Sequence, residues 1–288
     1  MRRCAFLTLA DAADYVVDDD LAHEPLRAHG WQVENVPWRR SGVDWRCYHA
    51  VVIRSTYDYV YAPDEFLDVL AGIADSGTRL FNSLDIVRWN LRKTYLRNLA
   101  ERGIPTAPTL WRTGLAGDEL STLFDELGAD EIIIKPVIGA NAGGAYRIAR
   151  GDAQRVALEI AAYYAGREAM VQPFLRSVID EGEYSLFYFD GTFSHAILKT
   201  PRPADFRVQE EHGGDIRSIV PGAALRAAGD AVLGKLSETP LYARVDLVRE
   251  GETFLLMELE LIEPSLYFRT DGEAAQRFAA ALDRRVGS

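Results

Sequence analysis

The first 88 residues alternate between strand-like and helix-like segments, and this alternation constrains the fold more than any other feature of the sequence. Four short apolar runs are typical of strands and cover residues 5–9, 31–36, 50–53 and 79–81. Between them, residues 21–29 and 63–73 have the patterns of helices. Strands that alternate with helices form a parallel sheet, and its ligands bind beyond the carboxyl ends of the strands. We therefore expect an α/β domain with an open parallel sheet at residues 1–88.

From residue 183 the sequence follows a different, strand-rich pattern. Runs at 184–189 and 193–199 flank Asp190-Gly191, a dipeptide typical of a tight hairpin turn. Further segments favour two strands and two helices, at 244–249, 253–262, 223–236 and 274–282. The polar segment 201–222 is longer than most unstructured connections, and such loops are often functional. The C-terminal half is thus predicted to be α+β.

Composition excludes several classes of function. A net charge of −11 and a pI near 5.0 argue against nucleic-acid binding through a basic surface. No apolar stretch reaches the roughly 18 residues that a membrane span needs, and the N-terminus does not resemble a signal peptide. Cys4 and Cys47 supply no disulfide framework, so we expect a cytoplasmic protein. The sequence leaves a homodimer open.

A lysine at a strand end precedes a glycine-rich segment in the middle of the chain. The apolar run 132–134 leads to Lys135, and glycines follow at 139, 143 and 144. The lysine offers a point charge to a phosphate oxygen, and the glycines let backbone N–H groups approach a polyphosphate closely. An ordinary glycine-rich hairpin is the alternative, since a lone glycine motif is weak.

Three carboxylates lie in the predicted hairpin 244–262, within an otherwise apolar frame. A turn centred on Gly251 puts residue 246 opposite residue 256, so that Asp246 shares a face with Glu258 and Glu260. Their mutual repulsion favours a hard dication, and we expect magnesium here. The alternative is a solvated hairpin face, and a register slip of one residue would separate Asp246 from the other two.

Several cationic side chains are candidates for phosphate binding. Asn90 is predicted to cap a helix over 91–102, with Lys93 in its first turn, where an anion would offset an unfavourable charge. Lys199 and Arg207 are further candidates, and the Arg207 guanidinium can hold two phosphoryl oxygens.

A polar cluster follows the buried strand at 50–53, where a parallel sheet binds its ligand. We expect Arg54 to bind the carboxylate or another anionic group of a substrate, with Ser55, Thr56 and Asp58 as polar contacts. The motif Glu263-Pro264-Ser265 lies just past the predicted metal strand, and it is a further candidate for substrate contact, with Ser265 as the proposed contact residue. The alternative is an ordinary polar loop.

The order of these clusters resembles the ATP-grasp superfamily over residues 88 to about 270. The resemblance is strongest to bacterial glutathione synthetase and RimK-type ligases. It rests on Asn90…Lys93, Lys135-Pro136 with Gly143-Gly144, Gln172-Pro173-Phe174-Leu175, Lys199…Arg207, Asp246 and Glu258-x-Glu260. A bacterial subgroup that includes the O-ureido-serine cyclo-ligase of cycloserine biosynthesis is also similar, at 52–59, 81–83, 88–93, 205–209 and 263–268.

The resemblance implies roles for individual residues. ATP phosphates would contact Lys93, Lys135 and the Gly143-Gly144 loop, while Gln172, Pro173, Phe174 and Leu175 would line the adenine and Glu183 would hold the ribose. Lys199 and Arg207 would act on the γ-phosphate and an acyl phosphate, and Asp246, Glu258 and Glu260 would bind two Mg²⁺ ions. Many members have Asn where this chain has Glu260, so the site is more anionic here and Mn²⁺ is an alternative metal.

The resemblance also implies a domain organisation and a reaction. A pre-ATP-grasp domain would occupy 1–88, a lid subdomain 89–174, and a subdomain with the metal site 175–288. The expected enzyme is an ATP- and magnesium-dependent ligase that activates a small-molecule carboxylate for attack by an amine or an internal nitrogen, in amino-acid or natural-product biosynthesis. An ATP-grasp small-molecule kinase and a non-catalytic ATP-binding protein are the alternatives.

Overall fold

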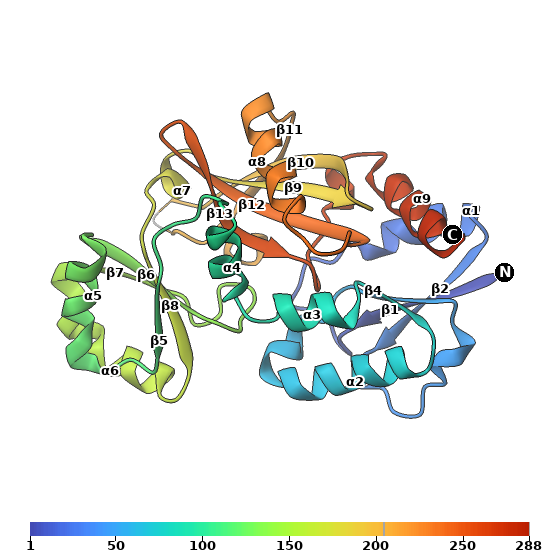
Figure 1. Ribbon diagram of the computed structural model, residues 1–288, viewed down its shortest axis with the longest axis horizontal. Coiled ribbons are helices and arrows are strands. Elements are labelled where there is room, and N and C mark those ends of the chain that lie inside the picture. The colour runs from blue at the N-terminus through green and yellow to red at the C-terminus, as the bar shows by residue number, and fades with distance from the viewer. Residues whose placement is uncertain (204, 288) are drawn as a thin grey trace.

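The computed structural model describes residues 1–203 and 205–287 and contains three sheets arranged as three lobes (Figure 1). The strands of the three sheets lie at 2–81, 110–173 and 183–260. The mixed α/β architecture and the parallel N-terminal sheet confirm the predicted fold class. Among the described residues, no helix has both the length and the apolar character needed to cross a bilayer.

The N-terminal lobe is a four-stranded parallel sheet in the order β2-β1-β3-β4. Its strands are β1 (Arg2–Thr8), β2 (Trp31–Pro37), β3 (Ala50–Ile53) and β4 (Arg79–Phe81). Helices α1 (His23–Ala28) and α2 (Pro63–Asp75) connect them. β3 is buried along its whole length, as its continuous apolar run predicts for a parallel strand.

The middle lobe is a four-stranded antiparallel sheet in the order β5-β8-β6-β7. Its strands are β5 (Leu110–Thr113), β6 (Glu131–Pro136), β7 (Tyr146–Ala149) and β8 (Glu168–Pro173). Helices α5 (Leu120–Leu127) and α6 (Ala153–Tyr164) pack on the face that carries Ile132 and Ile134. Because side chains alternate along a strand, Ile133 and Lys135 point to the opposite face, toward the rest of the molecule.

The connection between these lobes differs from the prediction. The single helix expected over 91–102 is two helices, α3 (Leu84–Asn90) and α4 (Tyr95–Glu101), and Ser83 rather than Asn90 is the N-cap, its hydroxyl accepting from Ile86 N. Asn90 instead ends α3 and bridges the main chain of Leu259 and Leu261. Lys93 lies in the turn between the two helices, not in the first turn of one.

The C-terminal lobe is a five-stranded antiparallel sheet in the order β11-β10-β9-β12-β13. Its strands are β9 (Glu183–Phe189), β10 (Thr192–Thr200), β11 (Asp215–Ile219), β12 (Tyr242–Glu250) and β13 (Thr253–Glu260). The short α7 (Ser177–Asp180) precedes it, and α8 (Ala223–Leu233) follows β11. The polar segment 201–222 is therefore partly a strand, because β11 pairs with the edge of β10.

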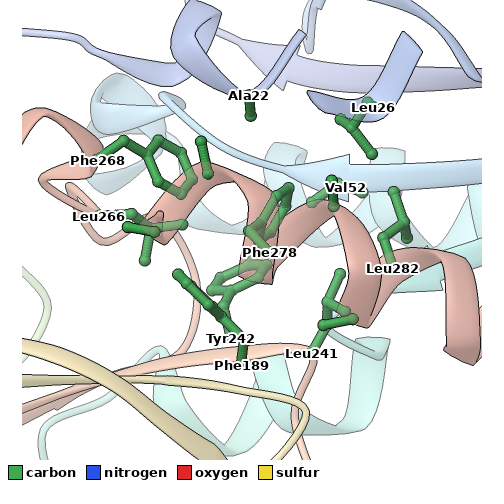
Figure 2. Close-up of a cluster of buried hydrophobic side chains, with 14 of the residues drawn as sticks. Ala22, Leu26, Val52, Phe189, Leu241, Tyr242, Leu266, Phe268, Phe278 and Leu282 are labelled. Carbon is green, nitrogen blue, oxygen red and sulfur yellow. The ribbon is translucent and has the colours of Figure 1, made fainter. Parts of the chain in front are cut away.

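The C-terminal helix α9 (Ala274–Gly287) joins the first and last lobes. Figure 2 shows Phe278 at the centre of an apolar cluster, with Ala22 and Leu26 on one side and Phe189 and Tyr242 on the other. This shared core fixes the N-terminal sheet against the C-terminal sheet, so that the cavity between them has rigid walls.

Candidate active site

A single cavity receives side chains from all three lobes. The N-terminal lobe contributes Tyr57 and Tyr59, and the middle lobe contributes Lys135. The C-terminal sheet supplies Lys199 and Asp246. The sequence-predicted phosphate, metal and nucleotide residues thus largely converge on one place, although they are spread over more than a hundred residues of the chain.

The metal carboxylates share one face of the β12–β13 hairpin because of a β-bulge. Asp246 pairs with Glu258, whereas Leu247 pairs with Leu256, so Met257 is the extra residue. The predicted pairing of residue 246 with residue 256 is wrong, although the predicted common face is correct. Ligand oxygens of Asp246, Glu258 and Glu260 lie within 4.8 Å of one another.

Each of these carboxylates already has a cationic partner. Lys93 forms an ion pair with Glu258. Arg244 contacts Asp246, with Nη2–Oδ2 at 3.0 Å, and also pairs with Glu260. Lys199 lies 3.4 Å from Asp246, and the Ser185 hydroxyl donates to the same carboxylate. The charge of the three acids is therefore balanced by groups that phosphate oxygens would also attract.

Burial and neighbouring charges perturb the pKa values of these acids in different directions. Burial opposes ionisation of Asp246, but Arg244 and Lys199 outweigh it and hold its pKa below the usual value. Burial raises the pKa of Glu260, and repulsion from Glu258 and Asp246 adds to the rise, against the attraction of Arg244. Glu260 is thus the most easily neutralised of the three carboxyl groups.

Arg244 is a site residue that sequence analysis missed. It precedes Asp246 by two positions, so both side chains point to the same face of β12, and it pairs with Glu260 across the hairpin. The spacing Arg-x-Asp on a buried strand could have identified it, because a buried guanidinium needs a carboxylate on the same face. Arg244 offsets the additional charge of Glu260.

Two lysines face the cavity in different electrostatic environments. Lys199 is buried and forms an ion pair with Glu183 at 2.5 Å. Lys135 makes no ion pair within the described residues, and burial lowers its pKa despite attraction from Glu258 and Glu183. A half-buried lysine without a carboxylate partner is suited to an anionic ligand, because that ligand would stabilise its charge.

The glycine-rich segment between β6 and β7 is held by close packing. Asn141 and Ala142 have positive φ angles of 50° and 55°. Gly143 lines the cavity, whereas Gly144 does not; a Cβ there would overlap the Tyr163 hydroxyl. The Gly144 carbonyl accepts a hydrogen bond of 2.6 Å from Tyr164, so Gly144 shapes the turn rather than facing a ligand.

The predicted nucleotide residues divide into two groups. Pro173, Phe174, Leu175 and Glu183 line the cavity. Gln172 is not among the lining residues. It pairs with Ile133 and shares that residue's face of the sheet, but its Nε2 donates to the Thr109 hydroxyl at 2.9 Å, so a neighbouring side chain holds its amide.

Arg207 lines the cavity, but its guanidinium is engaged by a neighbour. Its Nη2 lies 2.8 Å from Asp205 Oδ2, and its Nε donates to Oδ1 at 3.0 Å. These bonds from Arg207 lower the pKa of Asp205. Asp205 therefore holds the guanidinium in a fixed orientation at the wall of the cavity.

The polar cluster after β3 lies outside the cavity lining. Arg54 is buried and pairs with Asp19 at 2.7 Å. Ser55 and Thr56 are also buried, and Asp58 accepts from Trp38 Nε1 at 2.7 Å and pairs with Arg39. The burial of these side chains away from the cavity follows from tertiary packing, which strand position alone does not reveal.

Like Glu263 of the same predicted motif, Ser265 lines the cavity. The Tyr57 hydroxyl lies 3.2 Å from its Oγ. Glu263 lies at this end of the cavity, which Tyr59 also lines. Burial raises the pKa of Glu263 to about 7, and attraction from Lys93 limits the rise. The aromatic residues Tyr57 and Tyr59, which follow the buried strand β3, could have indicated this wall of the cavity.

The donor set fits a hard divalent cation. Three carboxylates converge within one small region, and oxygen ligands of this kind suit Mg²⁺ or Mn²⁺. Lys93, Lys135 and Lys199 lie around the same cavity and suit the phosphates that accompany such a cation. The residues present therefore fit both a metal and a nucleotide.

Comparison with known proteins gives matches over the whole chain. Residues 4–82 match the family model of the D-cycloserine synthetase DcsG N-terminal domain. The cycloserine biosynthesis protein DcsG of Streptomyces lavendulae is 34% identical over 297 residues, which cover 96% of this chain and 97% of that protein. The crystal structure of D-cycloserine synthetase DcsG superposes with a TM-score of 0.87 at 31% identity and covers 99% of both chains.

More distant solved structures share the fold. A RimK domain ATP-grasp protein from Sphaerobacter thermophilus has a TM-score of 0.73 at 18% identity, over 97% of this chain and 98% of its own. D-alanine–D-alanine ligase from Bacillus anthracis, solved in complex with ATP, has a TM-score of 0.68 at 15% identity, over 99% and 98%.

Proposed function

The chain belongs to the ATP-grasp ligase family, in the group of the cycloserine biosynthesis protein DcsG, and from this premise we propose that it activates a small-molecule carboxylate as an acyl phosphate. Membership makes it a C–N ligase that uses ATP. The proposal adds the intermediate, the residues that act on it, two Mg²⁺ ions and the substrate.

One observation supports the proposal above the others. Lys135, which has no ion pair among the described residues, faces the same cavity as the three metal carboxylates. A lysine that could bind phosphate and carboxylates that could bind a metal ion thus lie in one cavity, where the three lobes meet. A protein that bound only an organic anion would need the lysines and not the carboxylates.

The proposed reaction has two steps. A carboxylate oxygen of the substrate attacks the γ-phosphorus of ATP, the bond to the β-phosphate oxygen breaks, and an acyl phosphate and ADP form. A nitrogen then attacks the acyl carbon, and phosphate leaves with the electron pair of the C–O bond. Catalysis consists of positioning and charge neutralisation, and no side-chain nucleophile is needed.

The chain's own residues have distinct tasks in these steps. Lys93, Lys135 and Gly143 hold the ATP phosphates, while Pro173, Phe174 and Leu175 flank the adenine and Glu183 binds the ribose. Lys199, Arg207 and Arg244 stabilise charge on the transferring phosphoryl group and on the acyl phosphate. Asp246, Glu258 and Glu260 would hold the metal, which supplies neutralisation of phosphate charge.

The similarity to DcsG suggests a specific substrate. We propose O-ureido-serine, whose internal nitrogen can attack its own activated carboxylate to close a ring. An intramolecular nucleophile needs no second amine site, and high effective molarity favours ring closure over hydrolysis of the acyl phosphate.

The test is ADP release by the purified protein with Mg-ATP and D- or L-O-ureido-serine, together with mass analysis of the product. Lys135→Ala should lower the rate on the order of a hundredfold, because a phosphate contact is lost. Lys235→Ala is the matched control, since Lys235 is exposed at the end of α8. A stable phosphorylated product would support a kinase instead, and ATP binding without turnover on any carboxylate would support a non-catalytic protein.

A further inference from the structure

The segment that follows β13 is held in place by side chains from several parts of the molecule. Four of its backbone carbonyls accept hydrogen bonds from buried or half-buried groups. The pairs are Ile262 with the Tyr242 hydroxyl at 2.8 Å, Pro264 with Arg54 at 2.9 Å, Ser265 with Arg244 at 3.4 Å and Leu266 with His195 at 3.0 Å. Tyr267 then adopts a left-handed conformation with φ of 48°. A short connection fixed at so many points has a defined shape before any ligand binds.

This scaffold gives Arg54 a different role from the one expected from the sequence. Its guanidinium is neutralised by Asp19 and donates to Pro264, so it acts on the segment rather than on a ligand in the cavity. Arg54 thereby fixes the main chain at Pro264, which lies between Glu263 and Ser265, two residues that line the cavity.

Glu263 is the charged side chain that the scaffold presents to the cavity. It is only 9% exposed, and Tyr59 lines the cavity beside it. In the described part of the chain it has no ion pair, whereas Asp246, Glu258 and Glu260 each have one. A buried carboxylate without a cation is unstable in its ionised form, so a cationic group in the cavity would stabilise it.

We propose that Glu263, together with Tyr59, Tyr57 and Ser265, binds the ammonium group of an amino-acid substrate. The inference rests on the proposed ligase function and adds its specificity-determining residue. An ammonium group has three N–H donors, and the wall offers a carboxylate and hydroxyl oxygens to accept them. The hydroxyls of Tyr57 and Ser265 lie 3.2 Å apart, and both residues line the cavity together with Glu263.

Binding at Glu263 also orients the substrate for activation. Arg244 contacts both the Ser265 carbonyl and the metal acids Asp246 and Glu260, so the ammonium wall and the reacting centre are joined by one side chain. An amino acid anchored by its ammonium group therefore presents its carboxylate near the cationic end of the cavity. A carboxylic acid without the ammonium group loses this anchor and leaves Glu263 unpaired.

A fourth metal ligand is the main competing role for Glu263. Its oxygens are not part of the cluster whose ligand atoms lie within 4.8 Å of one another. The two roles also respond differently to Glu263→Gln. Loss of a metal ligand changes the Mg²⁺ concentration needed for half-maximal rate, whereas loss of an ammonium partner changes the KM for the amino acid.

The experiment compares matched pairs of substrates by ADP release, with hydroxylamine as a general nitrogen nucleophile. The pairs are O-ureido-serine with 3-(ureidooxy)propanoate, alanine with propanoate, and serine with 3-hydroxypropanoate, the amino acids in both stereochemical forms. For the stereoisomer that supports ADP release, the wild-type protein should have a kcat/KM roughly 30-fold to 1,000-fold higher than for the matched acid that lacks the ammonium group. In Glu263→Gln this preference should fall to within about threefold, through a higher KM for the amino acid.

Three controls keep the outcome specific. The KM for ATP and the Mg²⁺ half-saturation should be unchanged in Glu263→Gln, and Glu101→Gln, at the exposed end of α4, should behave as the wild type. Glu263→Asp, which retains the charge, should recover part of the preference. A wild-type protein that uses both members of a pair equally would overturn this inference alone. No ADP release with any pair would overturn the ligase proposal, and the ammonium site with it.

Discussion

The two faces of the five-stranded C-terminal sheet have opposite chemistry, although the same strands form both. One face is apolar, and α4 and α8 cover it with contacts to Leu186, Val245 and Leu259. The other face bears Lys199, Asp246 and Glu258 at the cavity. Toward the N-terminal lobe this second face becomes apolar again, with Phe189 and Tyr242 packed against α9 (Figure 2).

The difference shows how a charged site can be built inside a folded protein. The apolar face supplies the hydrophobic burial that holds the strands together. Because side chains alternate between the two faces along each strand, charged residues can then occupy the other face. The charges are stabilised in pairs, as in Lys199 with Glu183 and Arg244 with Asp246. The bulge at Met257 brings Glu258 and Glu260 to the face of Asp246, because without it Asp246 would oppose Met257 and the two glutamates would point to the apolar face.

The largest expected effect is on the charged face. Asp246→Asn should lower the rate of ADP release on the order of a thousandfold, since the amide cannot supply charge to a metal or to Arg244 and Lys199. Steady-state kinetics over a range of Mg²⁺ concentrations would measure it. Thermal unfolding is the necessary companion measurement, because activity lost only through unfolding would contradict the assignment of Asp246 to the reaction.

The apolar face should respond in the opposite way. Leu259→Ala removes a fully buried side chain and should lower the free energy of unfolding by about 3 kcal/mol. Once folded, this variant should keep its kcat within about threefold, because the Leu259 side chain lies in the apolar cluster on the opposite face of β13 from Glu258 and Glu260. Denaturant unfolding and kinetics on the same preparation would test both statements. A large fall in kcat at wild-type stability would show that the two faces are not independent.

The pH dependence of stability should reveal the unpaired carboxyl of Glu263. Its pKa is about 7 in the folded protein against a usual value of 4.5, so the unfolded chain ionises first as pH rises. The loss in the free energy of unfolding that this group causes therefore grows between about pH 4.5 and 7. At higher pH the loss stays at its full value. Glu263→Gln should remove about 2 to 3 kcal/mol of that loss, measured by unfolding at pH 5 and pH 8.5 with a chelator present. Parallel pH profiles for the two proteins would contradict the raised pKa.

The smallest expected effect concerns metal preference. Glu260→Asn removes one charge from the carboxylate cluster, while Arg244 keeps its contact with Asp246. The Mg²⁺ concentration for half-maximal rate should rise on the order of tenfold, because fewer charges attract the ion. Titration with Mg²⁺ and with Mn²⁺ would measure the change. An unaltered requirement for both metals would place Glu260 outside the metal site.

Much of this architecture follows from the sequence, and the exceptions have physical causes. The parallel N-terminal sheet, the hairpin at Asp190-Gly191 and the convergence of Lys93, Lys135 and Asp246 were predictable from local pattern and motif order. The bulge at Met257 was not, since pairing register depends on both neighbouring strands.

Side-chain direction was the second source of error. Gln172 and Arg54 belong to motifs that were predicted to contact ligands, yet their side chains bond to Thr109 and to Asp19. Position in a motif fixes where the backbone lies, whereas the partner of a polar side chain depends on which buried groups need a hydrogen bond. Arg244 was missed for the same reason, because its importance lies in tertiary pairing.

The most direct test of the central claim is the fate of the substrate's carboxylate oxygen. O-ureido-serine labelled with oxygen-18 in its carboxylate would be converted with Mg-ATP, and the released phosphate would be examined by mass spectrometry. The account predicts that each phosphate carries one carboxylate oxygen, because the acyl phosphate keeps that oxygen when the nitrogen displaces it. Phosphate without the label, formed together with the product, would contradict activation through an acyl phosphate.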